Sequence, residues 1–197
     1  MALDPDPYRA LLDDLAGEHA ALDALVAPLD VGRWQLPTPS PGWTVGDQIG
    51  HLHYFDGTAY LSVVDPAAFV IQREQLIAGF GDQEGVDDTT LAFARTVTPD
   101  ELLGAWRLGR KAMLSAFAAL APKDRLEWYG PPMSAMSFVT ARLMETWAHG
   151  QDVLDTVGGS RPATDRLRHV AHLGVRTEVS PMPSVAWSRR RVRYGWT

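Results

Sequence analysis

Apolar side chains recur at steps of three and four residues along almost the whole chain, and this spacing constrains the fold more than any other feature. Such a period places side chains on one face of an α-helix, whereas a half-buried strand alternates apolar and polar residues. We find no strand-like alternation and no internal repeat, so the sequence predicts an all-α protein. The stripe of the first helix consists of Tyr8, Leu11, Leu12, Leu15, His19, Leu22, Val26 and Leu29.

Start signals divide the rest of the chain into further helices. At three places a hydroxyl side chain precedes an apolar stripe and so predicts an N-cap, namely Thr44, Thr98 and Ser134. Four long helices of about 20 residues, each spanning roughly 30 Å, favour a four-helix bundle with an extra short C-terminal helix and an irregular tail. Beyond the first helix, we expect long helices over about 44–64, 98–121 and 134–157, and shorter ones over about 66–78, 88–96 and 165–177.

Composition and charge exclude several functional classes. The 197 residues include no cysteine, which excludes disulfides, cysteine-ligated zinc and a cysteine nucleophile. The net charge of −6 argues against a general binder of nucleic acid or of anionic membranes. No apolar run reaches the roughly 18–20 residues that a membrane span needs, and the first residues lack the basic and apolar regions of a signal peptide. We therefore expect a cytoplasmic protein that binds neither nucleic acid nor membrane.

Histidine and carboxylate residues offer a candidate metal site. Without cysteine, the ligands of a metal ion must be His, Asp or Glu. Glu145 and His149 are four residues apart on the last long helix, so their side chains lie one above the other and are spaced to chelate one ion. Asp152 shares that face and is a candidate acceptor for the other ring N–H of His149. The alternative is an ordinary surface Glu–His pair, which contributes about 0.3 kcal/mol.

A third ligand must come from another helix, and His51 is the candidate. Its side chain shares a face of the second long helix with Phe55, whereas His53 projects to nearly the opposite side and is poorly placed to bind the same ion. The alternative for His51 is a histidine at the edge of the core that is satisfied by a hydrogen bond.

Other polar residues have two interpretations each. Arg142 lies one turn before Glu145, where it would pair either with an anionic substrate or with Glu145 itself. His169 and His172 have metal-ligand spacing, but the flanking arginines favour ordinary surface or packing histidines. The arginine-rich segment 189–193 is typical of a solvated tail, and DNA binding is the less favoured interpretation.

Three short motifs together resemble a known family. They are Pro41-Gly42-Trp43-Thr44, His51-Leu52, and Glu145-x-x-x-His149 with Asp152 three residues later. In this order they resemble the DinB-like superfamily, and within it the metal-binding domain of the mycothiol-dependent maleylpyruvate isomerases. The resemblance covers roughly residues 1–160. It implies a divalent ion, zinc or alternatively nickel, held by His51, Glu145 and His149, with Asp152 behind these ligands and a coordination position left open for water or a thiolate.

The resemblance also implies a division of the chain. Residues 1–160 correspond to a DinB-like metal-binding helical bundle. Residues 161–197 correspond to the start of a C-terminal extension, because members of the family commonly continue into a second domain. That extension ends in a truncated or divergent tail, in which residues 178–197 carry one acidic residue and four arginines.

These implications support one expected function and its alternatives. Two histidines and a glutamate with an open position are typical of catalytic zinc, and such an ion lowers the pKa of a bound thiol or water. We expect a metal- and mycothiol-dependent transferase or isomerase that acts on a small molecule, and a homodimer is compatible with such bundles. The alternative is a non-catalytic metal-binding or structural bundle that lacks the family's second domain. A third, weaker hypothesis is a regulatory module that uses the arginine-rich tail.

Overall fold

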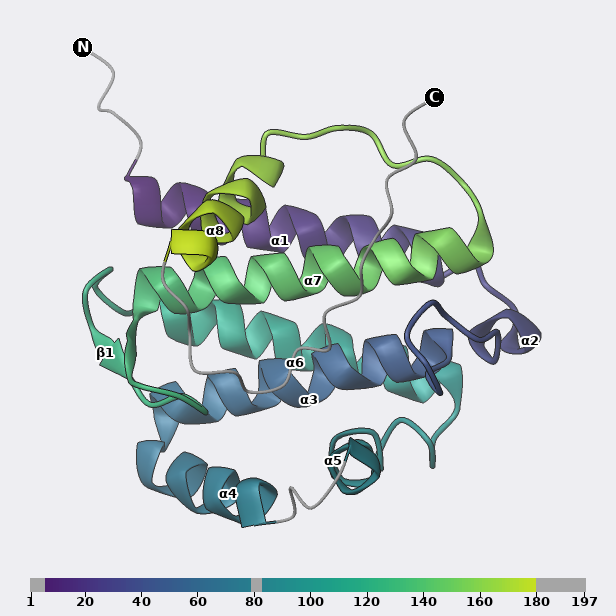
Figure 1. The fold of residues 1–197 in the computed structure, drawn as a ribbon, viewed down its shortest axis with the longest axis horizontal. Helices are drawn as coiled ribbons and strands as arrows, with labels where there is room; N and C mark the ends of the chain where they lie inside the picture. Colours follow the sequence, from purple (N-terminus) through teal and green to yellow (C-terminus); the bar gives the residue numbers. More distant parts are fainter. Residues whose placement is uncertain (1–5, 79–82, 180–197) are drawn as a thin grey trace.

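Four long helices pack lengthwise into one bundle in the computed structural model, which describes residues 6–78 and 83–179 (Figure 1). They are α1 (Pro7–Val26), α3 (Val45–Val64), α6 (Pro99–Ala118) and α7 (Ala135–Val157). Helix α1 packs mainly against α7, while α3 packs against both α6 and α7. The expected all-α fold and its four-helix bundle are confirmed. The two helices that carry the candidate ligands, α3 and α7, pack directly against each other.

Shorter helices surround the bundle. They are α2 (Val31–Trp34), α4 (Pro66–Ala78), α5 (Gln83–Thr90) and α8 (Leu167–Val179). Helices α4 and α5 pack against α3, and α8 packs on α7 (Figure 1). Helix α5 begins earlier than the segment 88–96 in which we expected a helix, and the second half of that segment forms turns.

A small antiparallel sheet is the one secondary-structure type in the described residues that the sequence did not predict. Strand β1 (Arg125–Leu126) pairs with β2 (Met133–Ser134), and Arg125 lies opposite Ser134. Strands of two residues are too short to show alternation, so the pattern carried no signal for them. The sheet matters because β2 runs directly into α7 and helps to set where that helix begins.

Hydroxyl caps start three of the four long helices, as predicted. Thr44 and Asp47 form a capping box at α3, in which the amide of Asp47 donates to Thr44 Oγ1 at 3.2 Å and the amide of Thr44 donates to Asp47 Oδ2 at 2.9 Å. Thr98 and Glu101 form the equivalent box at α6. Ser134 caps α7. These local bonds satisfy amides at the helix start that have no partner within the helix, and so they fix the first residue of each helix.

Apolar side chains fill the bundle in two clusters, one toward each end. Polar side chains are also buried in it, and they need partners because burying an unpaired polar group is costly. The largest fully buried apolar side chains are Tyr8, Phe69, Trp106, Phe117 and Phe138. The buried charged or imidazole side chains are Glu18, His19, Asp47, Asp56 and Arg142.

Two further expectations concern membrane-spanning helices and the C-terminal tail. In the described part of the chain, no helix combines the length and the apolar character that crossing a membrane requires. The arginine-rich segment 189–193, with the rest of the expected tail, lies outside the described residues.

Candidate metal centre

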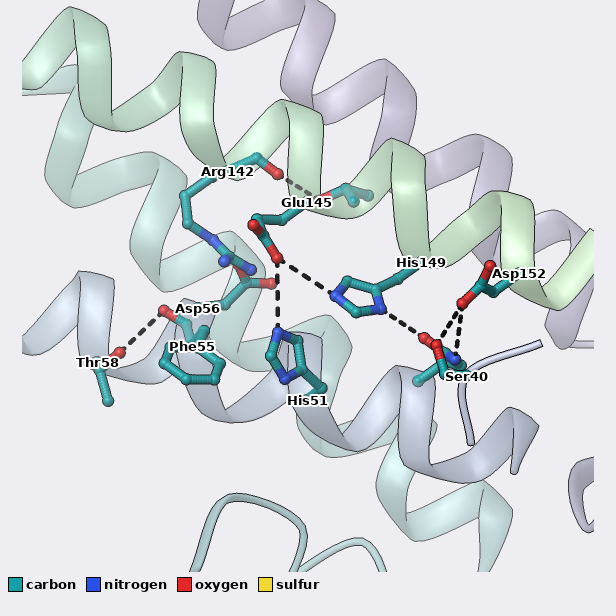
Figure 2. Close-up of polar contacts among 11 residues, drawn as sticks. Ser40, His51, Phe55, Asp56, Thr58, Arg142, Glu145, His149 and Asp152 are labelled. Atoms are coloured by element: carbon teal, nitrogen blue, oxygen red, sulfur yellow. Dashed lines mark hydrogen bonds and ion pairs between the residues drawn. The ribbon is translucent and has the colours of Figure 1, made fainter. Parts of the chain in front are cut away.

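Two histidines and one glutamate converge between α3 and α7. His51 comes from α3, and Glu145 and His149 come from successive turns of α7. Glu145 Oε2 lies 3.3 Å from His149 Nε2 and 3.6 Å from His51 Nε2, and the three side chains are 15–18% exposed. One potential ligand atom of each residue lies within 4.8 Å of those of the other two. Figure 2 shows both imidazole rings directed at the same carboxylate. The structure thus brings together the three residues that the sequence singled out.

Gln48 of α3 holds the second ring nitrogen of His149. Its Oε1 accepts a hydrogen bond from His149 Nδ1 at 2.5 Å. Its Nε2 donates to Thr38 Oγ1 at 2.9 Å and to Asp152 Oδ2 at 3.3 Å, and Ser40 Oγ donates to the same Asp152 oxygen at 2.6 Å. Asp152 therefore does not bond directly to His149, contrary to our expectation. It accepts from the amide of Gln48, and the oxygen of that amide accepts from His149.

This network decides which nitrogen of His149 carries a proton. A carbonyl oxygen only accepts, so the Nδ1 that faces Gln48 Oε1 must be the donor. The orientation of the amide follows from its Nε2, which faces the acceptor Asp152. In a neutral imidazole, Nε2 then directs a lone pair toward the Glu145 carboxylate, 3.3 Å away. Two acceptors at this distance repel each other unless a proton or a cation lies between them.

Aromatic rings enclose the three side chains. Trp43, in the loop before α3, stacks on His149 with ring centroids 5.8 Å apart and an interplanar angle of 15°, and its ring lies 5.1 Å from that of His51. Phe55 contacts His51 from the next turn of α3, at 4.5 Å between centroids. The indole Nε1 of Trp43 donates to Asp87 Oδ2 of α5 at 2.8 Å. These apolar walls lower the local dielectric, which strengthens charge interactions inside the cluster.

Burial and mutual contacts set the protonation of the cluster. The pKa of His51 is lowered to about 4, chiefly by burial and then by the neighbouring His149, against the opposing effect of Glu145. Burial acts to raise the pKa of Glu145, but the close approach of His149 and His51 holds the pKa of this carboxyl well below its usual range. A neutral imidazole and an ionised carboxylate are the protonation states that a metal ligand needs.

Arg142 has neither of its two expected partners. The side chain is 1% exposed, and its Nε and Nη2 both donate to Asp56 Oδ1, at 3.0 and 2.8 Å. The other oxygen of Asp56 accepts from Trp106 Nε1 at 3.0 Å and lies 3.6 Å from His19 Nε2. Burial of the guanidinium excludes the expected contact with a substrate, and its ion pair with Asp56 takes the place of the expected pair with Glu145.

Besides His19, three histidines lie outside the cluster. The ring of His53 packs on Phe93 at 5.0 Å between centroids, on another face of α3, as expected from its position along the helix. His169 shares a hydrogen bond of 2.9 Å with Asp14. His172 is exposed on α8.

Sequence analysis missed three polar residues around the site. Gln48 lies three residues before His51, so the spacing that pairs side chains on one helix face was a usable signal. Ser40 and Asp87 belong to the loop before α3 and to α5. Their contacts with Asp152 and Trp43 are long-range, and no local pattern announces them.

A helical bundle with a His/Glu/His cluster between two of its long helices defines a DinB-like protein. Residues 15–154 match the family model described as the mycothiol maleylpyruvate isomerase N-terminal domain. Because the match spans most of the chain, the protein belongs to this family.

Curated relatives extend beyond the matched part of this chain. Two proteins of Mycobacterium tuberculosis, one from each of two strains and both described as uncharacterised, are 49% identical to the chain over 174 residues. The match covers 88% of this chain and 65% of each relative, so the chain spans less than two thirds of their length.

Solved structures share the fold at low sequence identity. The crystal structure of the mycothiol-dependent maleylpyruvate isomerase has a TM-score of 0.57 and 16% identity, over 75% of this chain and 61% of that one. A histidine-to-alanine mutant under the same name has a TM-score of 0.62 and 15% identity, over 85% of this chain and 67% of that one. At these identities the likeness shows the fold.

Proposed function

We propose that His51, Glu145 and His149 bind one divalent metal ion, with zinc preferred and nickel as the alternative. The observation that carries the proposal is the 3.3 Å distance between His149 Nε2 and a carboxylate oxygen of Glu145. Because Nδ1 of the same ring faces Gln48 Oε1, Nε2 of the neutral imidazole is an acceptor. A cation between the two acceptors turns their repulsion into attraction to a common centre. In a tetrahedral zinc site with bonds of about 2.1 Å, neighbouring ligand atoms lie about 3.4 Å apart. The contacts of Glu145, at 3.3 and 3.6 Å, agree with that spacing.

The surrounding residues would prepare the ligands for such an ion. Asp152 and Gln48 would keep His149 in the tautomer whose Nε2 is unprotonated, a role that outer hydrogen-bond partners of metal-ligating histidines usually have. Trp43 and Phe55 would limit the access of water to the ligands. Three protein ligands leave one tetrahedral position, as in catalytic zinc sites. When bound, the ion supplies a lowered pKa to a thiol or water at that position.

We further propose that the chain supplies the metal-binding part of a metal- and mycothiol-dependent transferase or isomerase that acts on a small molecule. The family and the names of the two solved neighbours support this class. The chain has no cysteine, so a reacting thiol would come from a cosubstrate such as mycothiol, in the cytoplasm. Residues 1–160 would form the metal-binding domain and residues 161–197 the start of an extension. The homodimer stays a prediction.

Metal content tests the first part of the proposal. Protein purified without chelator or metal-affinity resin is analysed for elements, and we expect about one zinc or nickel per chain, as three ligands around one ion require. The His149→Ala variant is expected to lose the metal. His172→Ala is the matched control, because His172 is an exposed histidine on α8, and it is expected to retain the metal.

Two outcomes contradict the proposal at different points. Metal-free protein that takes up no added zinc would leave Glu145 and His149 as an ion pair in a non-catalytic bundle, which is the alternative function. If metal binds, mycothiol is added to the cobalt-substituted protein. An absorption spectrum that does not change would refute the thiol-dependent reaction while leaving the metal site intact.

A further inference from the structure

Asp56 lies where all four long helices of the bundle meet. This carboxylate of α3 is fully buried, with 0% exposure. It accepts hydrogen bonds from Arg142 of α7 and Trp106 of α6, and it lies 3.6 Å from Nε2 of His19 on α1. Both guanidinium contacts go to one oxygen, at 2.8 and 3.0 Å. Asp56 is therefore the counter-charge that keeps Arg142 inside the bundle.

Arg142 sits three residues before Glu145 on α7, and residues at this spacing are neighbours on one helix face. Figure 2 shows the two side chains next to each other, with the guanidinium turned toward Asp56 and the Glu145 carboxylate turned toward the two histidines. An arginine and a glutamate so close attract each other, and a guanidinium on this carboxylate would take the place of a cation between Glu145 and the histidines.

Stability alone does not require an ion pair at Asp56 and Arg142. Burying two charges costs desolvation, and well-packed neutral side chains are often as stable as a buried ion pair. Here the pair has a second effect. Because Arg142 lies next to Glu145, the presence of Asp56 determines which of the two carboxylates the guanidinium binds.

We infer that Asp56 is a positioning residue, which holds the Arg142 guanidinium inside the bundle and thereby keeps the Glu145 carboxylate free to bind a cation. The part of this inference that concerns metal binding rests on the proposed function. The part that concerns whether Arg142 pairs with Asp56 or with Glu145 does not depend on any metal.

The choice of partner is tested first, in protein stripped of metal with a chelator. Urea unfolding midpoints are measured for wild type, Asp56→Asn, Glu145→Gln and the double variant. In the Asp56→Asn background Arg142 moves to Glu145, so Glu145→Gln lowers the midpoint more than it does in wild type. An equal shift in both backgrounds would overturn the inference, whether or not wild type binds metal.

Zinc affinity is tested next, by competition with a chromophoric chelator. Asp56→Asn is expected to weaken binding at least tenfold, since Arg142 then competes for Glu145. Asp23→Asn is the matched control, because Asp23 likewise pairs with arginine, here Arg107 and Arg110, but away from the cluster. It is expected to change the affinity less than twofold.

Unchanged affinity in Asp56→Asn would contradict the inference. Absence of zinc binding in wild type would contradict the proposed function and leave the unfolding comparison to decide the inference.

A neutral pair covers the case in which Asp56→Asn alone does not fold. Asp56→Asn with Arg142→Met removes both charges, so no guanidinium is left to reach Glu145. We expect this variant to bind zinc within threefold of wild type. A folded neutral pair that has lost binding would show that the ion pair itself, rather than the removal of Arg142 from Glu145, maintains the site.

Discussion

At the scale of single residues, hydrogen-bond donors and acceptors determine what the cluster can bind. Gln48 is fully buried and has no freedom to exchange its two amide atoms, because Asp152 and Thr38 both receive bonds from its nitrogen. Its oxygen is thereby committed to His149. The amide of Gln48 on α3 thus links two residues of α7: it donates to Asp152 and accepts from His149.

Replacing Gln48 tests this relay. Gln48→Met keeps the volume of the side chain but removes the acceptor for His149 Nδ1, so the imidazole loses its preference for the tautomer that binds metal. We expect zinc affinity to fall roughly 10- to 100-fold, the usual effect of losing such a partner, as measured by chelator competition. Gln151→Met is the control, because its amide bonds to Asp155 on the exposed side of α7. Equal affinities for the two variants would refute the relay.

His19 gives the core a dependence on pH. The side chain is 2% exposed and meets Trp106 edge-on, and neither ring nitrogen has a hydrogen-bond partner among the described residues. Burial lowers the pKa of His19 to about 4, although Asp56 acts in the opposite direction. An unfolded histidine has a pKa of about 6.5. The stabilisation from the neutral ring is therefore fully present above pH 6.5 and is lost progressively as the pH falls toward 4.

Acidification is accordingly expected to destabilise wild type more than His19→Leu. Across this range the difference in unfolding free energy between the two proteins should change by about 3 kcal/mol, the equivalent of the full pKa shift. Urea unfolding at a series of pH values measures it. His172→Leu, on the surface of α8, should keep the wild-type dependence. Parallel curves for wild type and His19→Leu would show that the ring does not titrate between the two pH values.

At the scale of elements, a helix cap far from the cluster is expected to contribute to folding stability without affecting metal binding. Thr98 Oγ1 accepts from the amide of Glu101 at 3.3 Å, at the exposed start of α6 and away from the histidines. Thr98→Ala should lower the unfolding free energy by about 1 kcal/mol and leave zinc affinity unchanged. Thr96→Ala is the control, because this exposed hydroxyl bonds to the carbonyl of Phe93 and caps no long helix. A loss of stability no larger than that of the control would show that the cap is dispensable.

Local signals account for what the sequence predicted correctly. Caps and apolar stripes located the long helices, because both depend on residues within one or two turns. Glu145 and His149 were identifiable for the same reason. His51 was the candidate from a second helix, and the resemblance to a family supported it. The structure confirms that the three lie together, while their binding of metal stays a prediction.

Long-range pairings account for what the sequence did not predict. Arg142 and Asp56 are 86 residues apart, and the spacing along α7 alone suggested Glu145 as the partner of Arg142. Asp152 was assigned directly to His149 because helix periodicity says nothing of a side chain that inserts from another helix, as Gln48 does. The two-residue strands form by pairing across a loop and leave no periodic pattern.

At the scale of the whole molecule, a buried acid fastens the segment after α7 to the bundle. Glu18 of α1 is 1% exposed and forms ion pairs with Arg161 and Arg166, the latter at 2.8 Å. Arg161 also donates to the carbonyl of Trp147 at 3.0 Å. Both arginines come from the connection between α7 and α8, so this connection and α8 are held against α1 and α7.

Removing the acid should release this segment selectively. Glu18→Gln leaves two arginines without their counter-charge, and amides of α8 should exchange at least tenfold faster with deuterium while those of α6 are unchanged. Asp14→Asn is the control, since Asp14 pairs with Arg168 and His169 at a more exposed position, and a smaller change is expected. Uniformly faster exchange in both helices would instead indicate that Glu18 supports the whole bundle.

The stacking of Trp43 on His149 has an optical consequence. An excited indole whose ring centroid lies 5.1 and 5.8 Å from those of two imidazole rings loses its energy efficiently to an ion with unpaired electrons held by those rings. Zinc has a filled d shell and lacks that route. Among the tryptophans in the described residues, Trp43 is the one that lies against both His51 and His149. The fluorescence of Trp43 should therefore report which metal is bound. Cobalt or nickel entering the cluster would quench its emission, and zinc displacing them would restore it.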